Sequence, residues 1–250
     1  MIGIVGGVGP YSGIDLLKKV FDNTLAKTDQ EHLDAILLSM SSKIEDRTAY
    51  LVGKVEINPA MAIKEVILKL EKAGATIAGI PCNTAHSERI FKVIQLELAK
   101  AKSKIELVNM IDETVSFITS NYPDISKVGV LSTTGTYKGK IYVAPLLLKG
   151  YEVIVPPLEM QENTIHPAIY HETYGIKACS NPIHPQAKEN LLQGISFLKA
   201  KGAQVLILGC TEIPLAITES KIMDMITIDP TNVLARALIQ KSNPQKLKPL

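Results

Sequence analysis

The chain has 250 residues, of which 46% are hydrophobic, so it is long enough to bury the core of one large or two modest α/β domains. A formal net charge of +2, scattered basic residues and only 5% aromatic residues argue against a nucleic-acid surface, which needs a basic face and stacking platforms. Residues 1–5 follow no basic segment of a signal sequence, and no later run approaches the about 20 apolar residues that cross a membrane. We therefore expect a cytoplasmic protein with a small-molecule partner, no membrane or nucleic-acid partner, and free cysteines.

The chain opens with an apolar strand, Ile2 to Val5, which runs into a glycine-rich turn at residues 6–10 and a helix at residues 11–25. Glycines at such a turn let backbone N–H groups approach an anion, so a nucleotide site has to be considered. Ser12 stands where the third glycine of the dinucleotide motif would fall, and no Gly-Lys-Ser/Thr sequence follows. The sequence therefore predicts no nucleotide site at this turn.

A second strand, at residues 35–40, leads to a charged cluster that contains Arg47. Arg47 follows the carboxyl end of this strand, which is where ligands collect in α/β sheets. Taken alone, the residue is more simply interpreted as a surface arginine paired with Glu45 or Asp46. An amphipathic helix at residues 59–73 then precedes an apolar strand that ends at Cys82.

Cys82 is followed by Asn83, Thr84 and a charged, periodic helix at residues 87–100. The N–H groups and the dipole at a helix start favour a thiolate, and the Asn and Thr side chains can cap the helix or bind a ligand. We expect a reactive Cys82, with an inert buried cysteine as the alternative.

The middle of the chain predicts further alternation of strands and helices. Thr133, Thr134 and Thr136 follow one of these strands, either as turn residues or as donors to a carboxylate. Three histidines and Cys179, between residues 166 and 184, fit no standard zinc spacing, and nearby prolines suggest irregular loops, so we predict no metal site. The expected strands are 105–110, 127–132 and 152–155, and the expected helices are 112–120, 142–149 and 159–172.

Residues 202–210 repeat the pattern of residues 74–82, because each begins with Gly-Ala, continues with an apolar stretch and ends in a cysteine. Gly3 lies 79 positions before Cys82, and Gly129 lies 81 positions before Cys210, each glycine in a similar strand. We therefore predict an α/β fold of two pseudo-symmetric domains, each with a parallel sheet flanked by helices. The expected domains are residues 1–106 with 219–250, and residues 107–218.

The chain closes with a short strand at residues 226–229 and an amphipathic helix at residues 231–241. Residues 242–250 contain two prolines and several polar residues. We expect this tail to be frayed.

The two cysteines suggest a reaction if the halves pack about an approximate twofold axis, because Cys82 and Cys210 would then face each other across a cleft. A base and an acid on opposite sides of one carbon, each about 3–3.5 Å away, can invert a stereocentre by proton transfer. Cations and N–H donors must hold the substrate carboxylate and stabilise the charge that develops. Arg47, Lys177 and the threonine loop are the candidates for this task.

Five segments resemble, in order, the signatures of the aspartate racemase family: residues 6–10, 46–50, 81–86, 133–136 and 209–212. The likeness spans nearly the whole chain. It implies a cofactor-independent isomerase of the aspartate/glutamate racemase superfamily, which interconverts L- and D-aspartate in the cleft between two α/β domains and is commonly a homodimer. It also implies that Cys82 and Cys210 are the paired acid and base, and that Arg47 and Lys177 hold carboxylates. The other residues that we expect at the substrate are Val8, Asn83, Thr84, Ala85, Thr133, Thr134, Thr211 and Glu212.

The sequence departs from the family pattern at Val8 and Gly13, both beside the expected pocket, and residues 180–185 look like an insertion that could move Lys177. Both cysteines and both cations are present, which favours an acidic substrate. Alternatives to aspartate racemisation are glutamate or broader amino-acid specificity, a maleate-isomerase-like reaction through a nucleophilic cysteine, non-catalytic binding of acidic metabolites, and thiol redox sensing.

Overall fold

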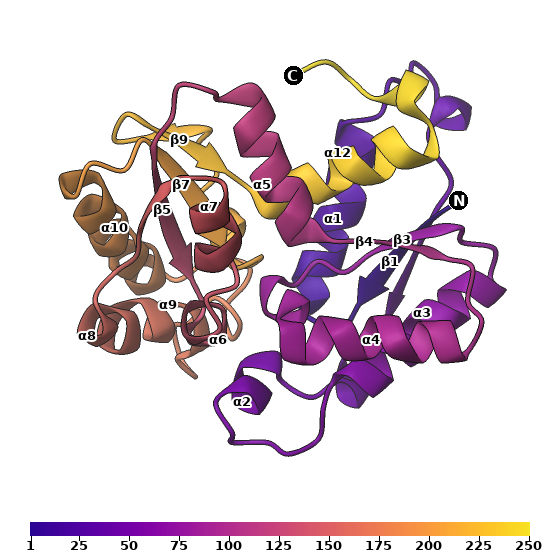
Figure 1. Cartoon of the computed structure of the whole chain (residues 1–250), viewed down its shortest axis with the longest axis horizontal. Coiled ribbons are helices and arrows are strands. Elements are labelled where there is room, and N and C mark those ends of the chain that lie inside the picture. The colour runs from indigo at the N-terminus through magenta and orange to yellow at the C-terminus, as the bar shows by residue number, and fades with distance from the viewer. The chain divides into compact units, whose positions relative to one another are not determined.

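The computed structural model describes residues 1–250 and divides into two compact units (Figure 1). The first unit comprises Met1–Glu113 and Thr231–Leu250, and the second comprises Thr114–Pro230. The chain passes from the first unit to the second within one helix, α5 (Met110–Asn121), and returns at the start of another, α12 (Pro230–Ser242). None of the helices combines the length and the apolar character needed to span a bilayer.

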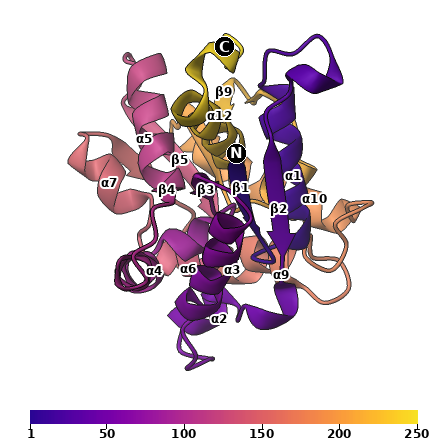
Figure 2. The same ribbon diagram turned by 90° about the vertical axis from the view of Figure 1, so that its right-hand side faces the viewer.

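The first unit is built on a four-stranded parallel sheet in the order β2-β1-β3-β4. Figure 1 shows α1 and α12 on one side of this sheet and α3 and α4 on the other, and Figure 2 shows β1 and β2 side by side. Adjacent residues of a strand face opposite layers, so Val5 packs with the α3 and α4 side chains while Ile4 packs with those of α1 and α12. The strands are β1 (Ile2–Gly6), β2 (Ala35–Ser39), β3 (Ile77–Gly79) and β4 (Glu106–Val108), and the other helices are α1 (Pro10–Asp22), α2 (Arg47–Leu51), α3 (Ala60–Lys72) and α4 (Glu88–Lys100).

The second unit has a five-stranded sheet in the order β6-β5-β7-β9-β8, parallel except for the edge strand β8. Strand β7 is buried throughout and its neighbour β5 is buried except at Lys127, and the buried face of α10 packs against both. The strands are β5 (Lys127–Ser132), β6 (Glu152–Ile154), β7 (Val205–Gly209), β8 (Lys221–Ile222) and β9 (Met225–Ile228). The helices are α6 (Thr134–Lys138), α7 (Val143–Leu148), α8 (Leu158–Met160), a π-helix (Gln161–Ile165), α9 (His166–Tyr170), α10 (Pro185–Ala200) and α11 (Ile213–Ala216).

The two units repeat one topology, because β2-β1-β3-β4 corresponds strand for strand to β6-β5-β7-β9. The repeated Gly-Ala pattern has a packing reason. A Cβ atom built on Gly3 would lie 3.0 Å from the Cβ of Ala75, and one built on Gly129 would lie 3.0 Å from the Cβ of Ala203. The prediction of an α/β fold with two domains and parallel sheets is therefore confirmed, and a small residue in the first strand of each unit lets the helix-to-strand turn pack closely.

Three expectations differ from the structure. The sequence predicts residues 219–230 in the first domain and residues 107–113 in the second, but β9 pairs with β7 in the second sheet, and the first unit extends to Glu113. The single helix expected at residues 159–172 is broken by a five-residue π-helix. The tail is not frayed, because Leu25 N–H donates to the Lys246 carbonyl (2.6 Å) and Lys248 N–H donates to the Asn23 carbonyl (2.9 Å).

Candidate active site

Cys82 lies beyond the end of β3 and is buried, with 6% of its surface exposed. It caps a short 3₁₀-helix, Asn83–His86, and α4 begins only at Glu88, because Ser87 adopts an extended conformation between them. The helix predicted at residues 87–100 is therefore present, but a 3₁₀ turn separates its start from Cys82. Asn83, Thr84 and Ala85 are buried in the short 3₁₀ turn that follows the thiol.

His86 fixes the loop that carries Cys82. Its Nε2 accepts a hydrogen bond from the N–H of Met110 (3.2 Å), so the proton resides on Nδ1, which donates to the Cys82 carbonyl (2.9 Å). The imidazole is buried and stacks on Phe91, with ring centroids 4.8 Å apart. Burial lowers the pKa of His86 from 6.5 to about 4, so the ring is neutral at physiological pH.

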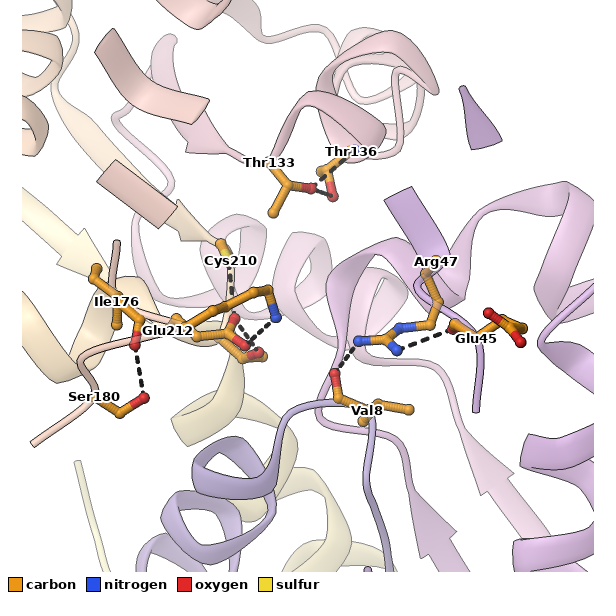
Figure 3. Close-up of polar contacts among 11 residues, drawn as sticks. Val8, Glu45, Arg47, Thr133, Thr136, Ile176, Ser180, Cys210 and Glu212 are labelled. Carbon is orange, nitrogen blue, oxygen red and sulfur yellow. Dashed lines mark hydrogen bonds and ion pairs between the residues drawn. The ribbon is translucent and has the colours of Figure 1, made fainter. Parts of the chain in front are cut away.

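Arg47 is buried, so its interpretation as a surface arginine was wrong. Asp46 caps α2 by accepting a hydrogen bond from Ala49 N–H (2.7 Å), and Arg47 is the first residue of that helix. Its guanidinium donates to the backbone carbonyls of Val8 and of Glu45, the latter at 3.1 Å (Figure 3). Val8, which was expected to contact substrate, thus holds Arg47 through its carbonyl while its side chain packs in the core.

The glycine-rich turn before α1 has a steric role. Gly7 has φ of +85°, and a Cβ built on it would lie 2.7 Å from the backbone nitrogens of both Met40 and Ser41. Only glycine permits both this conformation and this approach. The turn therefore brings Val8 close to the segment that follows β2, and Arg47 follows that segment.

Cys210 follows β7 directly and is also buried, with 3% of its surface exposed. Its Sγ donates to Glu212 Oε2 (2.9 Å), and Thr211 Oγ1 donates to the same oxygen (3.2 Å). Glu212 Oε1 forms an ion pair with Lys177 Nζ at 2.6 Å. Figure 3 shows the Cys210 and Glu212 side chains turned toward each other.

Burial is the largest cause that raises the pKa of Cys210 well above its ordinary value, and the negative charge of Glu212 adds to it. The positive charge of Lys177 acts in the opposite direction. Cys210 is therefore a thiol at neutral pH in this arrangement, and it has a proton to give.

The loop after β5 carries threonine hydroxyl groups that form hydrogen bonds near the start of a helix. Thr133 caps α6, with its Oγ1 accepting from Thr136 N–H (3.2 Å) and donating to Thr136 Oγ1 (3.1 Å; Figure 3). Thr134 Oγ1 lies 3.1 Å from His166 Nδ1. Gln161, fully buried in the π-helix, donates from Nε2 to the Ser132 carbonyl (3.1 Å) and so supports the same loop. π-helical turns often occur at functional sites.

The segment that carries Lys177 is anchored by its backbone and its side chains. Lys177 N–H donates to the Ile169 carbonyl (3.1 Å), and Ser180 Oγ donates to the Ile176 carbonyl (2.6 Å; Figure 3). The Lys177 ammonium also lies 5.4 Å from the centre of the Tyr170 ring. Residues 180–185 therefore leave Lys177 within reach of Glu212.

The histidines of this segment have structural partners. His171 stacks on Tyr174 with ring centroids 3.9 Å apart, and His184 accepts a hydrogen bond from Gln186 N–H (3.2 Å) at the start of α10. Nowhere in the chain do three His, Cys, Asp or Glu side chains gather in a way that could hold a metal ion.

Each unit thus gathers its expected residues at the carboxyl edge of its own sheet, which is where ligands bind in α/β folds.

The sequence alone gave no role at the site to His86, Gln161 or His166. His86 belongs to the 81–86 motif, which could have singled it out, but its partner Met110 is distant in sequence. The first unit contributes Val8, Arg47, Cys82, Asn83, Thr84 and Ala85, and the second contributes Thr133, Thr134, Lys177, Cys210, Thr211 and Glu212.

Similar proteins are known both by sequence and by structure. The broad-specificity amino-acid racemase RacX of Bacillus subtilis (strain 168) is 27% identical over 246 residues, which cover 96% of each chain. The structure of Picrophilus torridus aspartate racemase is 29% identical, covers 99% of this chain and 95% of its own, and superposes with a TM-score of 0.80. An aspartate racemase homologue from Pyrococcus horikoshii is 25% identical, covers 96% of this chain and 97% of its own, and has a TM-score of 0.71.

A protein-family model also matches nearly the full length of the chain. The model of the Asp/Glu/Hydantoin racemases matches residues 5–238, which include both cysteine strands and every candidate site residue named above. The prediction of this superfamily from the sequence is confirmed. The chain belongs to the Asp/Glu/Hydantoin racemase family.

Proposed function

We propose that this racemase interconverts L- and D-aspartate without a cofactor, with Cys82 and Cys210 as its acid and base. The observation that carries the proposal is the matched content of the two units. Each unit ends an inner strand close to a buried cysteine, and each places one cation, Arg47 or Lys177, at the same edge of its sheet. Two cations suit the two carboxylates of aspartate.

The reaction needs one sulfur on each side of Cα. A Cys82 thiolate takes the Cα proton and becomes a thiol, and the electron pair left on Cα spreads into the α-carboxylate. Cys210 then gives its proton to the opposite side of the carbon and becomes a thiolate, so the product has the opposite configuration and no atom is gained or lost. Because a Cα proton is a weak acid, the cations must stabilise the charge that develops on the carboxylate.

The similarity to an aspartate racemase supports aspartate as the substrate, whereas the similarity to a broad-specificity enzyme supports a wider range of amino acids. Assays on a panel of L-amino acids that includes aspartate, glutamate and alanine distinguish narrow from broad specificity. We expect the optical activity of L-aspartate to decay to zero fastest. Comparable decay of alanine would instead assign broad specificity, and formation of fumarate from maleate would assign an isomerase of the maleate type.

Replacement of the thiols tests the mechanism. We expect Cys82→Ala and Cys210→Ala each to lower the rate of racemisation by about 10³-fold or more, since removal of a general acid or base typically costs 10²–10⁴-fold. Cys179→Ala is the matched control, because Cys179 is only half-buried and its Sγ donates to the Thr173 carbonyl (3.2 Å). Racemisation that survives in both single variants would contradict the proposal, as would equal loss in the control.

Two further expectations accompany the proposal. We expect a homodimer, which light scattering of the purified protein measures as a mass of twice 27.2 kDa. The cytoplasmic location stays a prediction from the sequence.

A further inference from the structure

Glu212 is a buried carboxylate with three donors around it. Its residue is 5% exposed, and its two oxygens receive the Cys210 thiol (2.9 Å), the Thr211 hydroxyl (3.2 Å) and the Lys177 ammonium (2.6 Å). A buried carboxylate remains charged only where cations and hydrogen-bond donors surround it, which is the case here. A charged Glu212 can only accept hydrogen bonds, so the proton of the Cys210 contact must reside on sulfur.

Lys177 fixes the direction in which this carboxylate points. The ion pair engages Oε1 and leaves Oε2 to Cys210 and Thr211, so the two sides of the carboxylate have different partners. The side chain of Lys177 is 25% exposed, whereas that of Glu212 is 7% exposed. Lys177 is therefore the more accessible partner of the ion pair, while Glu212 is buried in contact with the thiol.

We propose that Glu212 is a positioning residue that holds Cys210 in its thiol form, so that Cys210 begins the racemisation cycle as the proton donor. The inference rests on the proposed function and deepens it, because it assigns the acid of the substrate-free enzyme. Cys82 is then the base that takes the proton from Cα. In this role Glu212 acts on Cys210 and not on the substrate. Its negative charge would repel the substrate carboxylates.

The other charged or titratable groups around Cys210 agree with this assignment. The negative charge of Glu212 raises the pKa of Cys210, and Lys177 lowers it by less than burial and Glu212 raise it. Tyr142, which precedes α7, is fully buried and its own pKa is raised by burial, so it faces Cys210 as a neutral phenol. Asp229 interacts with Tyr142 and raises the pKa of that phenol further.

The test is a titration of each cysteine in protein labelled with ¹³C at cysteine Cβ, whose chemical shift follows loss of the thiol proton. Resonances are assigned with Cys82→Ser and Cys179→Ser variants. In Glu212→Gln, we expect the pKa of Cys210 to fall by about one unit or more, because a neighbouring negative charge is removed and Lys177 remains. Glu219→Gln is the matched control, since Glu219 is a half-exposed carboxylate of the same unit that pairs with Lys188 at 3.7 Å. It should leave Cys210 unchanged.

The pH profile of racemisation gives a second readout that a merely structural role would not move. The alkaline limb of kcat/KM reports loss of the proton from the acid of the free enzyme. We expect this limb to shift to lower pH in Glu212→Gln by the same amount as the Cys210 titration, and to stay in place in Glu219→Gln.

An unchanged Cys210 titration in folded Glu212→Gln overturns the inference, whatever the activity. If the unaltered protein racemises no amino acid but Cys210 still titrates lower in the variant, the proposed function fails while the control of Cys210 by Glu212 stands. Should Glu212→Gln not fold, ¹³C labelling of glutamate Cδ in the unaltered protein replaces it. The Glu212 resonance must then shift at the pH at which Cys210 loses its proton, and absence of that shift overturns the inference.

Discussion

Single residues fix the candidate site residues of each unit through contacts to the backbone as much as through contacts between side chains. Arg47 is held by two backbone carbonyls, and the Cys82 loop is held by one imidazole. The Cys210 thiol, in contrast, donates to a charged side chain two positions further along the chain. The two cysteines therefore occupy similar places in the repeat but have different polar partners.

His86 predicts a pH dependence of stability. Its pKa is lowered to about 4 in the folded protein, against 6.5 when unfolded, so the unfolded chain binds the proton more tightly. The contribution of a neutral His86 is complete above pH 6.5 and is lost as the pH falls from 6.5 to about 4. A difference of this size corresponds to about 3 kcal/mol of unfolding free energy.

Urea unfolding across this pH range measures the effect. In His86→Gln, the part of the decline due to this group should disappear, while unfolding at neutral pH should become easier because Met110 N–H and the Cys82 carbonyl lose their partner. His32→Gln is the control, because His32 is exposed and should leave the decline unchanged. An unaltered pH dependence in His86→Gln would show that the ring is not the buried neutral group described here.

At the scale of elements, the repeat rests on a close contact between the first strand of each unit and the helix-to-strand turn. A methyl group added at Gly3 meets the Cβ of Ala75, and one added at Gly129 meets the Cβ of Ala203, each at 3.0 Å. We expect Gly3→Ala and Gly129→Ala each to lower the unfolding free energy by about 1–3 kcal/mol, the usual cost of overpacking.

A second substitution tests the contact itself. Ala75→Gly should recover part of the loss in Gly3→Ala, because it removes the methyl group that clashes, and Ala203→Gly should do the same for Gly129→Ala. The crossed pair, Gly3→Ala with Ala203→Gly, should show simple additivity, since these residues are not partners. Equal recovery in matched and crossed pairs would refute the contact.

Much of the element order could be predicted from the sequence, because buried parallel strands read as short apolar runs between amphipathic helices. The expected strands all occur near their predicted positions. The 3₁₀ turn after Cys82, the π-helix and the edge strand β8 could not be foreseen. Each depends on the hydrogen-bond partners that a few backbone groups find in the folded chain. The periodicity of apolar residues does not specify those partners. The tail follows the same rule, because Leu247 packs against the core beside α1.

The site could be predicted in its chemical groups but not in its connections. The two cysteines and Arg47 stand in recognisable motifs at strand ends. The ion pair of Lys177 with Glu212, in contrast, joins residues 35 positions apart, and neither local sequence predicts it. The buried state of Arg47 likewise depends on the carbonyl of Val8, which reaches it from 39 positions away.

At the scale of the whole molecule, the duplicated α/β unit gives each copy one buried cysteine and one cation, Cys82 with Arg47 in the first and Cys210 with Lys177 in the second. The chain of the second unit begins within α5 and ends at Pro230, so both connections run through helix residues. The Asp/Glu/Hydantoin racemase model spans residues 5–238 and so covers most of both units. Under the mechanism proposed above, a single unit therefore holds only one of the two thiols that act on Cα.

The proposed mechanism requires two thiols to act on opposite sides of the same substrate Cα. The fate of the Cα hydrogen during racemisation in ²H₂O tests this requirement most directly. If one sulfur removes the proton and the other delivers a second one, early D-aspartate formed from L-aspartate will carry solvent deuterium at Cα. The L-aspartate that remains will still carry protium. Early product that retains the original protium, or deuterium that enters remaining substrate as fast as product, would instead show that a single group both removes and returns the proton.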